Sequence, residues 1–173
     1  FDLNGDGHND FLLIGSNGGG LGGNSASTTL VPLDSNEIAF GRYDSCFGFS
    51  GYIYATALPE TFALGQPIDS NANWVKTSLT LANNNFVMNN YNCSANIPWP
   101  VNLGLRIFSG NDTLYGWINF QGLGAGSYTV SALACNTAPA FISSQTKSPA
   151  ITISPNPAQQ WVKIQFTDSG TYN

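Results

Sequence analysis

Residues 2–10 (DLNGDGHND) concentrate side-chain oxygens in a chain that is otherwise poor in charge. These side chains fall at positions 1, 3, 5 and 9 of a D-x-N-x-D-G-x-x-D loop: Asp2, Asn4, Asp6 and Asp10. The backbone carbonyl of His8 falls at position 7, and Gly7 at position 6 permits the sharp turn. Oxygen ligands at this spacing wrap a hard cation. The sequence therefore predicts that the loop at residues 2–10 binds Ca²⁺.

The loop differs from an EF-hand at position 12, where Leu13 replaces the bidentate Glu. Strand-forming residues follow in place of a helix, and we expect the loop to lead directly into a β-strand. Every predicted ligand is consumed in holding the turn, which favours a structural role for the ion. The alternative is a turn rich in Asp and Asn whose carboxylates are solvated and bind no ion.

Catalytic groups are scarce in the sequence. A hydrolytic triad would need the single histidine, His8, which already lies in the predicted loop. Glycoside cleavage would need two carboxylates facing each other across a cleft. The acids outside the loop stand mostly in turn-like segments: Asp34, Glu37, Asp44, Glu60, Asp69, Asp112 and Asp168. We therefore expect a protein that is not an enzyme.

Exposed aromatic rings offer a different chemistry, because they can stack on the faces of sugars. Trp74, Tyr91 and Trp99 are the candidates, and the prolines on either side of Trp99 hold it in a rigid loop. Trp117 alternates inward with its strand and is expected in the core. The alternative for the three candidates is ordinary packing, since a core of this size needs several large rings.

The three cysteines, Cys46, Cys93 and Cys135, are too far apart in the sequence to match a metal-binding motif. In an oxidising compartment one pair can close a disulfide. Cys46 and Cys93 are the predicted pair because both stand in loop-like contexts, YDSCFG and NYNCSAN. The alternative is three unpaired, buried thiols.

Composition narrows the class of protein. The 173 residues have a net charge of -5 and only 9% charged residues, while 42% are hydrophobic. The five Lys and Arg residues are scattered, so no basic stripe is available for nucleic acid. No apolar run approaches the roughly 18 residues that span a bilayer. Solubility must come from amides and hydroxyls, which is typical of an extracellular all-β protein with many turns.

The elements that position these residues are predicted to be strands. Short alternating runs rich in β-branched and aromatic residues recur between turn-forming clusters. The expected strands are residues 10–14, 27–31, 49–55, 74–81, 85–88, 103–108, 113–121 and 127–134. Residues 16–24 are expected to form a hairpin loop, and residues 83–85 and 89–90 to form turns. The predicted fold is an all-β antiparallel sandwich, jelly-roll or immunoglobulin-like, with a C-terminal extension strand.

The composition changes near Pro139. We expect a sandwich domain over residues 1–142, a linker over 143–150 and an extension over 151–173. The extension includes an alternating run at 161–166 (WVKIQF), which cannot bury its own apolar face. The extension is therefore expected to pack against a neighbouring subunit or an open sheet edge.

Three segments resemble, in this order, an uncharacterised calcium-loop β-sandwich ectodomain of secreted, Bacteroidota-like bacterial proteins. They are residues 30–41 (LVPLDSNEIAFG), 103–120 (LGLRIFSGNDTLYGWINF) and 127–140 (SYTVSALACNTAPA). The loop at residues 2–10 is similar to those of integrin-like propeller repeats and dockerins. Cys135 departs from the family, which usually has an aromatic residue there, and the family's strand before the loop would precede Phe1.

The tail resembles the opening of a type IX secretion C-terminal sorting domain: a strand, then P-N-P-A at residues 155–158, then an alternating strand. This resemblance implies export across a bacterial outer membrane to the cell surface or the extracellular space. Residues 112–114 (DTL) match the O-glycosylation pattern of that phylum, which makes Thr113 a candidate. An ordinary hairpin turn is the alternative.

These observations predict a secreted, calcium-stabilised structural or adhesive protein. The absent first strand and the orphan C-terminal strand are complementary, as in fibre subunits that polymerise by strand exchange. A homopolymer assembled through the C-terminal strand is therefore expected. The alternative function is a carbohydrate-binding module whose partners are glycans.

Overall fold

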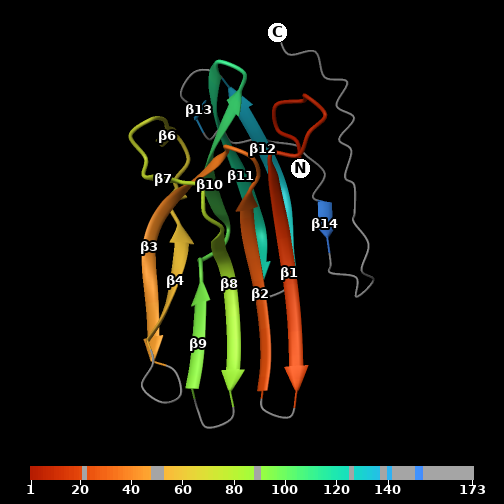
Figure 1. The fold of residues 1–173 in the computed structure, drawn as a ribbon, viewed down its shortest axis with the longest axis vertical. Coiled ribbons are helices and arrows are strands. Elements are labelled where there is room, and N and C mark those ends of the chain that lie inside the picture. The colour runs from red at the N-terminus through yellow and green to blue at the C-terminus, as the bar shows by residue number, and fades with distance from the viewer. Residues whose placement is uncertain are drawn as a thin grey trace.

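The computed structural model describes residues 1–20, 23–47, 53–87, 91–124, 127–136, 140–141 and 151–153. Within them every regular element is a β-strand, and none is a helix long and apolar enough to cross a membrane. Two antiparallel sheets account for most of the strands (Figure 1). The predicted all-β class is thereby confirmed.

Four long strands form the smaller sheet in the order β1-β2-β8-β9. They are β1 (Phe11–Gly20), β2 (Gly23–Pro32), β8 (Leu79–Val87) and β9 (Tyr91–Asn96). Strands β1 and β2 pair antiparallel as far as Gly20 and Gly23. The hairpin predicted at residues 16–24 is therefore present, but its connection is shorter than expected because the ladder continues through the glycines.

The larger sheet has the order β14-β12-β11-β10-β3-β4. Its strands are β14 (Ile151–Ile153), β12 (Ser127–Asn136), β11 (Asp112–Gly124), β10 (Val101–Ser109), β3 (Glu37–Phe47) and β4 (Ile53–Pro59). The predicted extension strand is represented by β14, which pairs antiparallel with the edge strand β12. The tail thus begins on an open edge of its own sandwich.

Residues from both sheets share one hydrophobic core. Phe11, Leu30 and Leu81 come from the smaller sheet, and Leu105 and Phe120 come from the larger one; all five are completely buried. Alternate residues of β10 are buried against this core, as expected for a strand with one face inward. The shared core shows that the two sheets face each other as a β-sandwich.

A second, smaller cluster lies on the outer face of the larger sheet. It contains Ala39, Phe62, Ile68 and Trp117, all buried. The segment that covers this face holds three short strands: β5 (Thr61–Phe62), β6 (Pro67–Ile68) and β7 (Trp74–Val75). Strand β5 pairs with β10, β7 pairs with β3, and β6 pairs with β13 (Ala140–Phe141). Trp117 is buried as predicted, but beneath this covering segment.

Several sequence predictions were wrong in detail. Strand β3 was not expected, because Gly41 and the charges that follow it interrupt the apolar alternation. Residues 83–85 lie inside β8 and not in a turn, since β2 and β9 pair with them on both sides. The ladder hydrogen bonds outweigh the turn preference of asparagine. The turn expected at residues 89–90 lies outside the described residues.

Candidate functional site

The predicted calcium loop is closed by its own backbone. The carbonyl oxygen of Phe1 accepts hydrogen bonds from the amides of Asp10, at 3.0 Å, and Phe11, at 3.3 Å. Gly5 and Gly7 have φ angles of 77° and 88°, values that a side chain would strain. The chain turns at the two glycines and returns to enter β1; the turn at Gly7 and the strand after the loop were predicted, and the turn at Gly5 was not.

Side-chain oxygens of the loop are held by backbone amides. The two carboxylate oxygens of Asp2 accept hydrogen bonds from the amides of Gly5, at 2.7 Å, and Gly7, at 2.8 Å. The carboxylate of Asp6 accepts from the amide of His8 at 2.8 Å and from the side chain of Asn4 at 3.0 Å. These hydrogen bonds lower the pKa of Asp6, the backbone bond contributing most. The exposed turn therefore keeps Asp6 ionised.

Asp10 has a different environment from the other acids of the loop, because it is buried. One carboxylate oxygen accepts from the amides of Leu3, at 2.7 Å, and Asn4, at 3.3 Å. The other accepts from the side-chain amide of Asn36 at 3.1 Å. The Asn36 side-chain oxygen accepts from the amide of Phe108 at 3.0 Å. Asp10 and Asn36 thus connect the loop to β10.

The donor chemistry of the loop fits calcium, because the predicted ligands offer carboxylate, amide and backbone oxygens only. None of Asp2, Asp6 and Asp10 has an ion-pair partner within the described residues. No three His, Cys, Asp or Glu side chains in that part of the chain are close enough together to hold a metal. Asp10 is buried, whereas Asp6 is exposed. Calcium binding therefore remains a prediction.

The three cysteines lie in strands. Cys46 is in β3 and Cys93 in β9, so the loop-like contexts assigned to them were wrong. Their side chains lie outside the described part of the chain, and the disulfide remains a prediction. Cys135 is a free, half-buried thiol whose sulfur donates to the carbonyl of Leu3 at 3.0 Å. Desolvation, followed by the charges of Asp10 and Asp2, raises the pKa of Cys135.

Trp74 is not an exposed platform for sugars. Its side chain is half-buried and packs against the second cluster, and its indole nitrogen donates to the carbonyl of Asp69 at 3.0 Å. The guanidinium of Arg106 lies 5.0 Å from the centre of the Trp74 ring and forms an ion pair with Glu37. These contacts assign Trp74 to packing, which was the alternative expectation.

The remaining predicted residues divide by exposure. Trp99 is 60% exposed, as expected for a ring available to a ligand. Tyr91 begins β9, but its side chain lies outside the described part of the chain. Thr113 is half-buried in β11, opposite Phe108 and next to the hairpin turn. Of the three aromatic candidates, the structure presents Trp99 at the surface.

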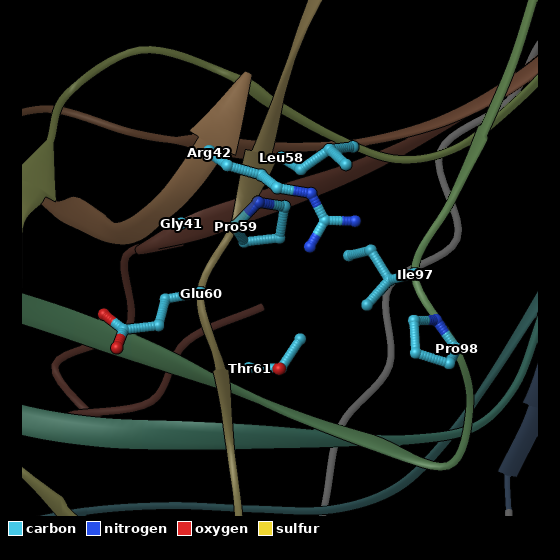
Figure 2. A pocket seen from close by; sticks show the side chains of 8 residues that line it. All are labelled: Gly41, Arg42, Leu58, Pro59, Glu60, Thr61, Ile97 and Pro98. Carbon is cyan, nitrogen blue, oxygen red and sulfur yellow. The ribbon is translucent and has the colours of Figure 1, made fainter. Parts of the chain in front are cut away.

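A cavity of about 290 Å³ lies beside the segment that carries Trp99 (Figure 2). Three separate parts of the chain line it: Gly41 and Arg42, residues 58–61, and Ile97 with Pro98. Figure 2 shows the Arg42 guanidinium directed into the cavity, and the Glu60 carboxylate directed away from that guanidinium. The sequence did not identify this site, because its walls come from three segments that lie far apart in the chain.

Two further groups escaped the sequence analysis. Asn36 was not singled out in the sequence, although its side chain connects the predicted loop to β10. Glu37 and Arg106 face each other across β3 and β10. The chain has only ten acids and five basic residues. One acid and one base that both lie in apolar strands could therefore have indicated the ion pair between Glu37 and Arg106.

Comparison with protein-family models, with curated proteins and with solved structures gives no match to this chain. The function therefore has to be argued from the loop, the sheet edges and the cavity.

Proposed function

We propose that this chain is a secreted, calcium-stabilised β-sandwich with a structural or adhesive role outside the cell and no catalytic activity. Its β12 edge accepts a C-terminal strand, either its own or that of a neighbouring copy. The observation that carries this proposal is the antiparallel pairing of β14 with β12, in which Thr129 lies opposite Thr152. The tail's resemblance to a sorting domain supports export across a bacterial outer membrane.

The β12 edge is well suited to strand addition. Strand β14 pairs only with residues 128–130, although β12 extends over Ser127–Asn136. Charges and prolines often protect exposed edges, and the sequence of β12 (SYTVSALACN) has neither. A register shift against β11 leaves Ser131 of β12 unpaired, just after the three residues that β14 pairs with. Main-chain hydrogen bonds supply affinity when an extended segment joins such an edge. A second chain can therefore occupy the same edge by the same pairing.

Cysteine cross-linking tests exchange between chains. The experiment uses a background in which Cys46, Cys93 and Cys135 are replaced by serine. One protein carries Thr129→Cys and another carries Thr152→Cys, because residues directly opposite in an antiparallel ladder lie at disulfide distance. Mixing the two under oxidising conditions should give a covalent heterodimer if the strand pairs in trans. The control is a single chain with both substitutions, which should close an internal disulfide.

Absence of the heterodimer, together with closure of the internal disulfide, would show that the tail stays on its own domain. The fibre role would then be excluded. Heterodimer formation with regular filaments in electron micrographs would support it.

Calcium stabilisation is tested separately by thermal unfolding. Asp2, Asn4, Asp6, the His8 carbonyl and Asp10 are the proposed ligands. A ligand that binds only the folded state, present at 100 times its Kd, stabilises by about 2.7 kcal/mol. We expect Ca²⁺ to raise Tm and a chelator to reverse the effect. Asp6→Asn should abolish the shift, whereas Asp44→Asn, an exposed acid in β3, should retain it.

A chelator that leaves Tm unchanged in both variants and in the unsubstituted protein would contradict calcium binding. The loop would then be held by its own hydrogen bonds alone.

Carbohydrate binding is the second candidate function, and the exposure of Trp99 favours it. An exposed aromatic ring can stack on a sugar face without reorganisation of the fold. Binding on a glycan array that is lost in Trp99→Ala would support this function.

A further inference from the structure

The cavity beside Trp99 has the features of a small ligand site. Ligand pockets have volumes of roughly 300–1,000 Å³. The volume of this cavity, about 290 Å³, is close to the lower end of that range. Leu58 and Ile97 give it buried apolar walls, and Thr61 contributes a hydroxyl. We infer that this cavity binds a sugar ring that carries one carboxylate, with Arg42 as the group that recognises the charge. The inference rests on the carbohydrate-binding function proposed above.

Arg42 is available to a ligand. It is exposed, and the part of the chain that the structure describes gives it neither an ion pair nor a side-chain hydrogen bond. Figure 2 shows its guanidinium inside the cavity, on the opposite side of Pro59 from the Glu60 carboxylate. An arginine fork binds a carboxylate through two parallel hydrogen bonds, so this geometry favours a carboxylate ligand.

A β-bulge positions the guanidinium. Phe40 pairs with Pro59 and Arg42 with Leu58, which leaves Gly41 as an extra residue in β3. A Cβ atom at Gly41 would lie 2.7 Å from the carbonyl oxygen of Pro59, so the close approach of the two strands requires glycine. Bulges reorient side chains and are common beside binding sites. Here the bulge directs Arg42 into the cavity.

The wall of the cavity formed by Ile97 and Pro98 favours a sugar ring. Pro98 lines the cavity and is followed by Trp99, whose ring is largely exposed. A ligand that Arg42 holds and that extends past Pro98 meets the segment that carries this exposed aromatic ring, and a sugar that bears one acidic group can use both contacts. Arg42 is the only cation among the lining residues, and the net charge of -5 disfavours ligands with several negative charges. A terminal uronic or sialic acid residue has this chemistry.

Binding is measured by NMR titration of backbone amides and arginine side chains. The probes are the methyl glycosides of glucuronic acid, galacturonic acid and N-acetylneuraminic acid, with methyl glucoside as the neutral match. We expect at least one acidic probe to shift the signals of Thr61, Ile97 and Arg42. Arg42→Gln should weaken its binding by at least about tenfold. Lys76→Gln removes an equal charge at another exposed position and should change binding less than about twofold.

Three results would overturn the inference: no acidic probe binds with a Kd below about 10 mM, Arg42→Gln binds as tightly as the unsubstituted protein, or the neutral glucoside binds as well as the acids. Neutral binding that is lost in Trp99→Ala would leave carbohydrate binding intact while excluding recognition of a carboxylate. Thermal melts of both charge variants, expected to match the unsubstituted protein, separate lost binding from lost folding.

Discussion

Two arginines of the same sheet have opposite surroundings. Arg106 lies in β10 directly opposite Glu37 of β3, forms an ion pair with it and contacts the rings of Trp74 and Phe108. Arg42 also belongs to this sheet, but it follows a bulge and faces a cavity. Regular register gives Arg106 a charged partner across the ladder, whereas the described residues give Arg42, after the bulge, no ion pair. The charge of Arg106 therefore joins two strands of the sheet, whereas the charge of Arg42 faces the cavity.

The same contrast applies to the carboxylates of the two regions. Glu37 is buried and paired with Arg106, and the described residues place no cation on Glu60. Burial without a partner raises the pKa of Glu60. We therefore expect removal of the Glu37 charge to lower the free energy of unfolding much more than removal of the Glu60 charge.

The largest effect is expected at the paired region. Glu37→Gln leaves the Arg106 guanidinium partly buried without a counter-charge, which should lower the free energy of unfolding by about 3 kcal/mol. Urea denaturation at pH 7 measures this change. Glu60→Gln is the matched control and should change stability by less than about 0.5 kcal/mol. Equal losses in the two variants would show that the two regions do not differ in the way proposed.

A smaller effect is expected from Gly41→Ala. The added methyl group would contact the Pro59 carbonyl and force β3 away from β4, at a cost of about 2 kcal/mol. Gly122→Ala is the control, since its nearest neighbouring atom would lie at an ordinary 3.6 Å. Urea denaturation compares the two variants, and NMR of the Arg42 side chain reports whether the guanidinium moves. Unchanged stability in Gly41→Ala would show that the bulge is not tightly packed.

The contrast also explains what could be predicted from sequence. The loop at residues 2–10 was recognised because its turn depends on local spacing. Strands β10 and β11 were recognised because their apolar residues alternate with polar ones. The paired arginine had a weak local signal. Arg42 had no such signal, because Gly41 and the neighbouring charges interrupt the apolar alternation that would have predicted β3. Its cavity exists only where three distant segments meet.

Residues 83–85 provide the opposite case. Three consecutive asparagines predict a turn from local preference, but β2 and β9 pair with them on both sides. Backbone hydrogen bonds to two neighbours determine the conformation there. The connection between Asp10 and Asn36 was missed for a related reason, since it depends on where β1 and β3 begin relative to each other.

The smallest effect is the pH dependence contributed by Glu60. Its pKa in the folded protein lies above the ordinary value of 4.5, so its stabilising contribution is full below that value and is lost as pH rises through the folded-state pKa. The stability difference between the unsubstituted protein and Glu60→Gln, measured by urea denaturation from pH 3.5 to 7, should therefore shift in favour of the variant as pH rises. Because Glu60 is only partly buried, solvent screening limits this shift to less than about 0.5 kcal/mol. A shift in favour of the unsubstituted protein would mean that Glu60 pairs with a cation, and Arg42 would no longer be free for a ligand.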